Sequence, residues 1–539
     1  MKCSVVVAAA LALARGGQCA IDADEVRALP GLGPGPLPSK QYSGLLPAGA
    51  GQHIHYHLSL SEGSPSTDPL VLWVQGGPGG SSMLGMFTEV GQWLVVPNSS
   101  DPALKAALIP NPGSWSKHAN MLYWEAPAGV GFSGCDGGQC PQYNDTTSAI
   151  YNAQFLCSFF AAYPEYASND FYLAGESYAG VYIPTLVLQI MQGAPACTAS
   201  INLKGLAIGN GCTGADVGPC SPGRGVNTFN QLSAHGMLSQ RTQRLVNEAC
   251  ADSLSFTQPS EACVQALLAA SHEAGAFNNY DVQDTCGPPS NPNQFAHMLC
   301  GWTQNAALCG KQGAGLNATL LDAAVASAAA FPPPEDNRAW ADGLLLSASG
   351  RNASAAAAAA AAAAPMSKMS ARVLGGADDT EETGAEAYPC GMEAALDTYL
   401  NNPAVIKAIH MDRANQSSWQ QHDISYTRSY GDLVAKMPAI IANYRVLIYS
   451  GDFDGQIPHG ATEDWVTGLA YPIKSAWAPW TLPTGQVAGY AIDYDVPTQF
   501  TYLTVKGAGH QVPTFRPREA AAMIGRFLNG SSFSGSNCE

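Results

Sequence analysis

The chain has 539 residues, enough for a large core, and its 46% hydrophobic content excludes an intrinsically disordered protein. Only 12% of the residues are charged, and the net charge is −17. Because nucleic acids and anionic membrane surfaces attract cations, this acidity argues against both as partners.

The first 20 residues have the pattern of a signal peptide. Lys2 precedes a short apolar run from Val5 to Leu13, and small residues near Ala20 suit cleavage. The run is too short to span a bilayer, so we expect no membrane anchor there. Secretory passage to a vacuole, a lysosome or the exterior is the predicted route. Six glycosylation sequons agree with a glycoprotein: Asn98, Asn144, Asn317, Asn352, Asn415 and Asn529.

Residues 52–60 alternate polar and apolar side chains, which predicts a half-buried strand. It carries His53, His55 and His57, which we interpret as a solvent-facing strand edge. A metal site is not predicted, because no acidic or cysteine partner with ligand spacing lies nearby in the sequence.

Short apolar runs alternating with helical patterns predict an α/β fold with a mostly parallel central sheet and helices on both faces. One helical pattern covers residues 150–163, and a closing helix is expected over residues 517–528. The predicted strands are 70–74, 121–124, 171–174, 203–208, 445–449 and 501–505.

The sequence pattern changes between residues 212 and 403, where cysteines cluster and strand-like apolar runs disappear. We predict that this segment is a helical, disulfide-containing cap inserted into a core made of residues 21–211 and 404–539. The alanine tract 355–364 has no amphipathic face, so we interpret it as a low-complexity surface loop.

Removing Cys3 and Cys19 with the signal peptide leaves 13 of the 15 cysteines, an odd number. In an oxidising compartment most should pair, with at least one thiol left over. Cys157, inside an apolar helical pattern, is the predicted free thiol.

The stretch Gly175-Glu176-Ser177-Tyr178-Ala179-Gly180 lies between a predicted strand and a predicted helix. Small residues around a serine allow the sharp strand-to-helix turn that projects its hydroxyl above a sheet. We therefore predict that Ser177 is a nucleophile. Alone, this short motif is weak evidence, because a purely structural turn explains many such matches.

A serine nucleophile needs a base, and the base needs a carboxylate to orient it. Asp452 and Asp454 follow one late strand, and His510 follows the last strand in a Gly-Ala-Gly-His turn. We predict Asp454 and His510 as partners of Ser177, and expect Asp452 to brace its own turn.

Stabilising an oxyanion takes two backbone donors. The amide of Tyr178 is one candidate, since it directly follows the nucleophile. The second is the amide of Gly77, in the glycine-rich run after the strand 70–74, where the main chain can approach a substrate closely.

With these residues in place, the chain resembles the serine carboxypeptidase family, within the α/β-hydrolase fold. The resemblance implies the triad Ser177, Asp454 and His510 and the oxyanion donors Gly77 and Tyr178. The matching blocks are WVQGGPGGSS (73–82), FTEVG (87–91), YWEAPAGVGFS (123–133), GESYAGVYIP (175–184), IGNG (208–211), YSGDFDGQIP (449–458) and KGAGHQVP (506–513).

The same resemblance implies that Gln75, Gly76, Glu89 and Glu176 bind the terminal carboxylate of the substrate. The family often has Asn at the position of Gln75, and the motif QGGPGG is closest to the vitellogenic-like and retinoid-inducible branch. No cofactor or metal is implied.

Three functions stay open from the sequence. The leading one is a serine-type carboxypeptidase that acts on peptide or protein C-termini, at acidic pH. A serine-carboxypeptidase-like acyltransferase using an ester donor, and a protective or binding protein with incidental activity, are the alternatives. A homodimer is an assembly that the sequence leaves open.

Overall fold

The computed structural model describes residues 21–533, apart from 34, 214–219, 222–224, 252–258, 285, 287–388, 414–417 and 422–423. The predicted signal peptide and the alanine tract 355–364 lie outside the described residues, as do the sequons Asn317, Asn352 and Asn415. None of the described helices has the length and apolarity that crossing a membrane would require.

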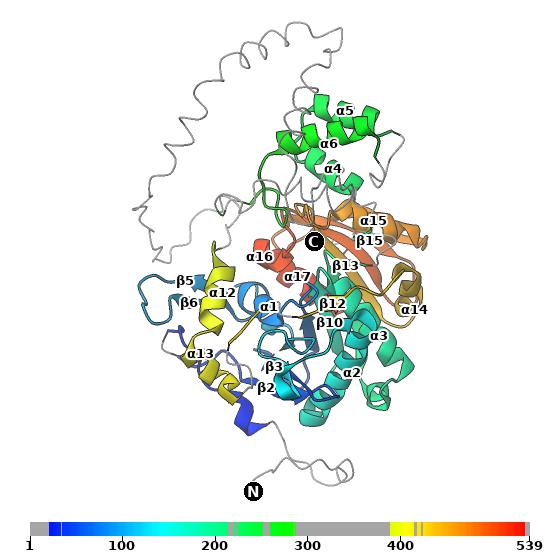
Figure 1. Ribbon diagram of the computed structural model, residues 1–539. Coiled ribbons are helices and arrows are strands. Elements are labelled where there is room, and N and C mark those ends of the chain that lie inside the picture. Colours follow the sequence, from blue (N-terminus) through cyan, green and yellow to red (C-terminus); the bar gives the residue numbers. More distant parts are fainter. Residues whose placement is uncertain are drawn as a thin grey trace.

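A twelve-stranded mixed sheet forms the centre of the described chain (Figure 1). The neighbouring strands β7, β4, β10, β11, β13 and β16 run parallel to one another. Antiparallel strands complete the sheet on both sides. In spatial order the strands are β1 (Glu25–Val26), β2 (Gln41–Pro47), β3 (Gln52–Ser59), β7 (Asn120–Trp124), β4 (Leu70–Val74), β10 (Phe171–Glu176), β11 (Leu203–Gly209), β13 (Arg445–Gly451), β16 (Phe500–Val505), β15 (Val487–Tyr494) and β14 (Ile473–Thr481), with β8 (Gly134–Cys135) beside β3.

Helices cover both faces of this sheet, which confirms the predicted fold class. The first group is α2 (Asp145–Ala162), α3 (Ala179–Gln192), α14 (Met437–Ile441) and α15 (His459–Gly468). The second group is α1 (Ser82–Thr88), α12 (Met392–Leu400), α13 (Pro403–Ala408), α16 (Val512–Phe515) and α17 (Pro517–Leu528). Two further two-stranded sheets pair β5 (Trp93–Pro97) with β6 (Ala106–Pro110), and β9 (Tyr143–Asn144) with β12 (Tyr426–Thr427).

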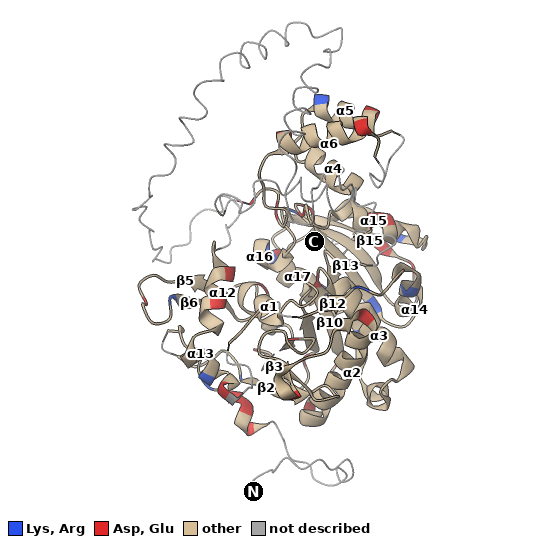
Figure 2. Ribbon diagram, viewed as in Figure 1, with Lys and Arg blue, Asp and Glu red and all other residues tan. Residues whose placement is uncertain are grey.

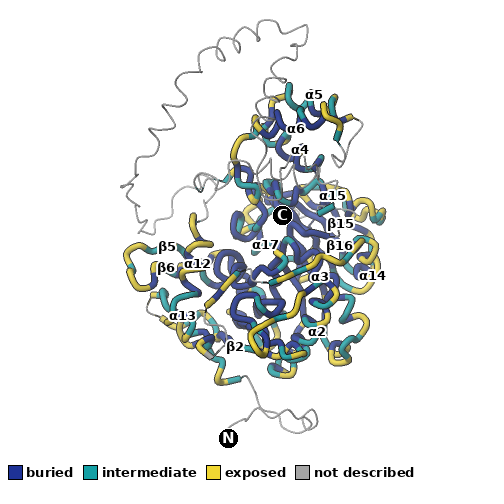
Figure 3. The backbone as a smooth tube through the Cα atoms, in the orientation of Figure 1, coloured by how far each residue is buried: buried dark blue, intermediate teal, exposed yellow. Residues whose placement is uncertain are grey.

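The central strands are apolar on both faces because each face packs against one helical layer. In β4, Leu70 and Leu72 belong to the core cluster that includes side chains of α2 and α3, whereas Val71 and Trp73 belong to the cluster with α1 and α17. Figure 3 shows this buried core beneath an exposed outer shell. Side chains alternate between faces along a strand, so a strand covered on both sides reads as an unbroken apolar run.

Helices α4 (Gly225–Ala234), α5 (Gln240–Ala249) and α6 (Glu261–Ala274) lie together at one end of the molecule (Figure 1). They share a small hydrophobic cluster of their own, which includes Phe229, Leu232 and Leu267. The predicted disulfides of this segment are confirmed for three pairs, Cys212–Cys220, Cys250–Cys263 and Cys286–Cys390. Cys300 and Cys309 lie outside the described residues.

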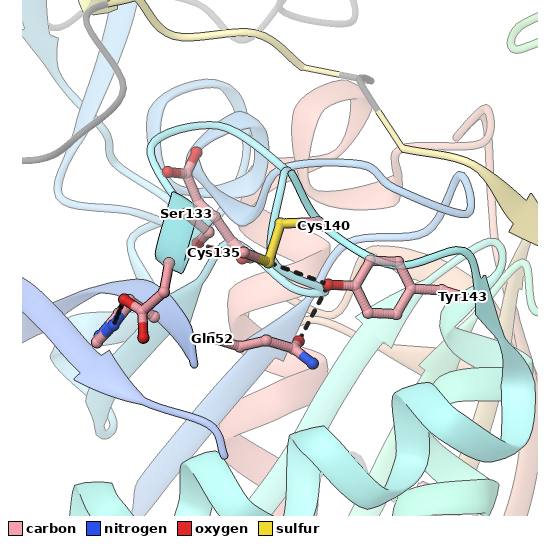
Figure 4. The surroundings of a disulfide bond; sticks show 8 residues. Gln52, Ser133, Cys135, Cys140 and Tyr143 are labelled. Atoms are coloured by element: carbon pink, nitrogen blue, oxygen red, sulfur yellow. Dashed lines mark hydrogen bonds and ion pairs between the residues drawn. A yellow bond between two sulfur atoms is a disulfide. The ribbon is translucent and has the colours of Figure 1, made fainter. Parts of the chain in front are cut away.

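The prediction that Cys157 is a free thiol is wrong, because it forms a disulfide with Cys197. Its partner lies in a short helical turn, Ala196–Ser200, that packs against α2. The apolar pattern of α2 concealed this contact, since a half-buried cysteine and a small apolar residue give the same periodicity. Another bridge, Cys135–Cys140, lies beside Tyr143 (Figure 4).

The interpretation of β3 as a solvent-facing edge is also wrong. The strand pairs with β2 on one side and β7 on the other, and both His55 and His57 are buried. His55 pairs with the buried carboxylate of Glu125, while His57 contacts Gln41 (Nε2–Oε1 2.9 Å). Burial lowers the pKa of His57 to about 3, so that side chain is neutral. Glu125 lies 70 residues from His55, and the local sequence gave no sign of it.

Candidate active site

Ser177, Asp454 and His510 follow the carboxyl ends of β10, β13 and β16 respectively. In the sheet these strands stand in the order β10, β11, β13, β16, all parallel. Their following loops therefore meet at one edge, the edge at which open α/β sheets place their sites.

Ser177 occupies a strained turn between β10 and α3. Its φ is +60°, in the left-handed region that residues with a side chain rarely adopt. The turn is fixed by three backbone hydrogen bonds: the Ser177 N–H donates to Gly209 (3.0 Å), and its carbonyl accepts from Gly180 (2.9 Å) and Cys212 (2.8 Å). A side chain on Gly76 would bring its Cβ to 2.6 Å from that of Ser177, so glycine is required there.

Asp454 contacts His510 through a short hydrogen bond, with 2.7 Å between Nδ1 and Oδ2. The same oxygen accepts a hydrogen bond from Asn210 Nδ2 (2.7 Å). The other carboxylate oxygen accepts from the N–H groups of Gln456 (2.7 Å) and Ile457 (3.0 Å). Four donors fix this buried carboxylate, which can hold the imidazole in one tautomer with Nδ1 protonated.

Asp452 is turned away from the imidazole. Its Oδ1 accepts from the Gly507 N–H (2.6 Å), at the turn that leads to His510. The structure thus brings Asp454, and not Asp452, into contact with the histidine.

Asn210 is a site residue to which the sequence gave no role. It has a φ of +41°, and its side chain links Asp454 to the Gly451 N–H (Oδ1–N 3.0 Å). Its place at the end of β11, between the strands that precede Ser177 and Asp454, was the signal that could have found it.

The second ring nitrogen of His510, Nε2, is buried and has no hydrogen-bond partner among the described residues. Ser177 Oγ makes no hydrogen bond to it, and catalytic hydrogen bonds are often long until a substrate is bound. Tyr280, which the sequence analysis missed, covers the imidazole with 4.9 Å between ring centroids. The backbone carbonyl of Tyr280 also accepts a hydrogen bond from the backbone N–H of His510 (2.6 Å).

The two predicted oxyanion donors lie on either side of Gly76. A Cβ on Gly76 would lie 2.5 Å from the Tyr178 nitrogen, and Gly77 follows with a φ of +115°. Neither the Gly77 nor the Tyr178 N–H donates to another group in the described ranges. Tyr178 immediately precedes α3, where N–H groups favour negative charge.

Gln75, Glu89 and Glu176 form a buried polar cluster beside Ser177. The Gln75 amide donates to Glu176 Oε1 (2.8 Å), and its carbonyl oxygen accepts from Trp73 Nε1 (2.9 Å). The Trp73 contact fixes which way the amide points. No N–H or O–H group of the described chain donates to either carboxyl oxygen of Glu89.

Both acids of this cluster have pKa values above those of exposed carboxylic acids. Burial raises the pKa of Glu89 to about 7. Burial, and then the charge of Glu89, raise the pKa of Glu176 well above its ordinary value. Two neighbouring buried carboxyls cannot both ionise without cost, so at mildly acidic pH the pair can offer O–H donors to a bound carboxylate.

Known proteins resemble this chain over most of its length. The family profile described as serine carboxypeptidase matches residues 30–530. The lysosomal protective protein of Mus musculus is 32% identical over 530 residues, covering 96% of each chain. Serine carboxypeptidase 1 of Hordeum vulgare is 30% identical over 518 residues, covering 94% of this chain and 93% of its own.

Among solved structures, Kex1(delta)p, a prohormone-processing carboxypeptidase from Saccharomyces cerevisiae, superposes with a TM-score of 0.58. It covers 91% of this chain and 92% of its own at 16% sequence identity, which supports the fold alone. The finer prediction of a vitellogenic-like branch stays a prediction. The family profile and the full-length relatives together show that the chain belongs to the serine carboxypeptidase family of hydrolases.

Proposed function

We propose that this enzyme removes the C-terminal residue from peptides and proteins through an acyl-serine intermediate, at acidic pH. The observation that carries the proposal is the buried pair Glu89 and Glu176 beside the turn of Ser177. Two carboxylic acids with raised pKa values can stay protonated and donate hydrogen bonds, which suits recognition of a carboxylate.

In this proposal the Ser177 hydroxyl attacks the carbonyl carbon of the last peptide bond and gives its proton to His510 Nε2. Asp454 holds the other ring nitrogen and stabilises the imidazolium that forms. The N–H groups of Gly77 and Tyr178 donate to the developing oxyanion. His510 then gives the proton to the leaving amine. In the second half, His510 takes a proton from water, the water oxygen attacks the acyl-serine, and the proton returns to the Ser177 oxygen as the acid product leaves.

The substrate's terminal carboxylate would bind among Gln75, Gly76, Glu89 and Glu176. Gln75 is oriented by Trp73, so its amide N–H₂ points towards the carboxyl cluster. A protonated glutamic acid donates a short, charge-assisted hydrogen bond to the incoming carboxylate. An acyltransferase would pass through the same acyl-serine, but an ester donor such as an acyl sugar has no free carboxylate for this cluster. Keeping both acids therefore favours the peptidase.

We extend the proposal to the cap. Contacts that support a cap over the site are the edge-to-face contact of Tyr280 with His510 and the hydrogen bond from the Gly455 N–H to the Asn279 carbonyl (2.9 Å). We keep residues 212–403 as the predicted extent of this insertion. The name of the mouse relative supports an acidic, lysosome-like compartment.

The test compares the KM of a blocked dipeptide with that of its C-terminal amide between about pH 4 and 8. As the pH rises through the raised pKa of Glu89, near 7, the donor is lost and a like charge appears. The KM of the free acid should therefore rise with pH, while that of the amide, which has no carboxylate, should stay level.

Glu89→Gln and Glu176→Gln serve as matched variants, because an amide donates without titrating. Each should flatten the rise in KM for the free-acid peptide. A KM for the free acid that is as level as that of the amide would overturn the role of the cluster. If neither the free acid nor the amide is hydrolysed, the proposed peptidase function is wrong.

A further inference from the structure

Arg428 lies over the ring of Tyr178, the residue that follows the nucleophile. Its guanidinium carbon is 5.2 Å from the ring centroid, a distance typical of a cation–π contact. Arg428 is exposed, and within the described ranges no carboxylate lies within 4.0 Å of it. The whole chain has 25 Lys and Arg against 42 Asp and Glu, and Figure 2 shows its cations scattered over the described elements.

A buried carboxylate holds this cation in place by fixing its neighbours. Asp145 accepts hydrogen bonds from the hydroxyl groups of Tyr178 (2.6 Å) and Tyr426 (2.8 Å). Its second oxygen accepts from the N–H groups of Ser429 (2.5 Å) and Tyr430 (2.8 Å). The ring beneath Arg428 and the chain on both sides of it are therefore tied to one anchor. Asp145 itself lies beyond ion-pair distance of the guanidinium.

The two residues beside Ser177 contact different groups through their side chains. The carboxyl of Glu176 contacts Gln75, where the terminal carboxylate is proposed to bind. The Tyr178 hydroxyl instead contacts Asp145. A peptide whose last residue occupies the Glu176 side must place its penultimate residue, which carries the attacked carbonyl, on the Tyr178 side.

We propose that Arg428 selects peptides with an acidic side chain at the penultimate position. The inference rests on the proposed peptidase function and names a substrate preference within it. A guanidinium presents paired N–H donors that match a carboxylate, and the contact with the Tyr178 ring holds this one beside the turn of Ser177. Desolvation beneath a bound peptide strengthens such a pair beyond one that is fully exposed.

The experiment measures kcat/KM for three blocked dipeptides that share a C-terminal Phe and carry Glu, Gln or Lys before it. Glu and Gln differ in charge but hardly in shape. At about pH 5.5 the substrate Glu is ionised, and at low ionic strength we expect it to exceed Gln about fivefold, with Lys below Gln. The Glu-to-Gln ratio should fall as salt is added, because the cation is exposed to solvent.

Arg428→Ala should bring the Glu-to-Gln ratio to about one, and Arg428→Glu should place Lys above Glu. Arg428→Lys should retain part of the preference, because it keeps the charge and loses the fork. Lys474→Glu is the control: it makes the same charge change on the exposed edge strand β14 and should keep the wild-type ratio.

Equal kcat/KM for the Glu and Gln peptides in the wild type would overturn the role of Arg428 and leave the peptidase intact. An equal shift in Lys474→Glu and Arg428→Glu would overturn it too, since net charge would then be the cause. If the wild type hydrolyses none of the three peptides, the proposed function fails first, and this inference fails with it.

Discussion

The described part of the molecule contains two buried histidine–carboxylate pairs that are almost identical at first sight. His510 Nδ1 lies 2.7 Å from Asp454 Oδ2, and His55 Nδ1 lies 2.7 Å from Glu125 Oε2. All four side chains are at most 2% exposed. What separates the two pairs is the other nitrogen of each ring.

His55 Nε2 lies 2.9 Å from the hydroxyl oxygen of Ser43, so that a serine, a histidine and a carboxylate stand in line here too. Ser43, however, donates its only proton to the Ile409 carbonyl (2.8 Å). It is therefore left to accept from the ring, so that both nitrogens of His55 are engaged, one by Ser43 and the other by Glu125. Neither ring nitrogen is left open towards a substrate, and the serine proton is already engaged.

His510 differs because its Nε2 has no partner in the described part of the chain, and the nearby Ser177 sits at a strand-to-helix turn. A pair with an open nitrogen can move a proton, whereas a saturated pair can only hold structure together. The comparison shows that a serine–histidine–acid arrangement has chemical meaning only with an available proton site and oxyanion donors beside it.

The strongest way to break this comparison is to remove each serine. Ser177→Ala should abolish turnover, by on the order of 10⁶ in kcat. Ser43→Ala should keep turnover within a few-fold and lower the free energy of unfolding by about 1–3 kcal/mol, because a buried donor loses its acceptor. The measurement is hydrolysis of a blocked dipeptide beside denaturant unfolding. A Ser177→Ala enzyme with a tenth of wild-type activity would refute the assignment.

Replacing the acids sharpens the contrast. Asp454→Asn should lower kcat by about 10⁴, because the amide favours the wrong tautomer of His510. Glu125→Gln breaks the buried His55–Glu125 pair, so it should lower the free energy of unfolding by about 3–5 kcal/mol. We expect kcat of the folded Glu125→Gln enzyme to fall less than tenfold. Equal losses of kcat in both variants would mean that the two pairs are not distinct in role.

Removing the disulfide Cys157–Cys197 should lower the stability of the fold and leave catalysis unchanged. This disulfide joins α2 to the short helical turn Ala196–Ser200, over a sequence separation of 40 residues. Replacing both cysteines with serine should cost about 2–4 kcal/mol of stability. Since neither cysteine contacts the site, kcat/KM should stay at the wild-type value, and a tenfold fall would contradict the separation of structure from chemistry.

The smallest effect is expected in the cap. Mild reduction of bridges such as Cys250–Cys263 should loosen the small helical cluster that they staple, and substrate selection should change before the sheet unfolds. Mass mapping of the unreduced protein is the check on the premise. Finding these cysteines as free thiols, or no change in selectivity on reduction, would count against the cap as a selecting element.

The sequence predicted the parallel strands and the site loops because these signals are local. Leu70–Val74 is apolar on both faces, and small residues surround Ser177. It failed where a partner comes from a distant segment. The burial of His55 depends on Glu125, and the disulfide of Cys157 depends on Cys197, 40 residues away.

The edge strand β14 and its hairpin partner β15 were not predicted, and for β14 the reason is related. Most side chains of β14 are exposed, and its register shifts at several points, so it lacks a regular alternation. Asn210 lies within the matching block IGNG (208–211). Its role follows only from the sheet order, which places it between Ser177 and Asp454.

The most direct test of the account is to map the serine that a fluorophosphonate probe labels. Such a probe needs an activated hydroxyl, a base with a free nitrogen and an oxyanion site, and only Ser177 is predicted to have all three. Peptide mass mapping should find one adduct, on Ser177, that disappears in Ser177→Ala and persists in Ser43→Ala. An adduct on another serine, or no adduct on the folded protein, would contradict the account.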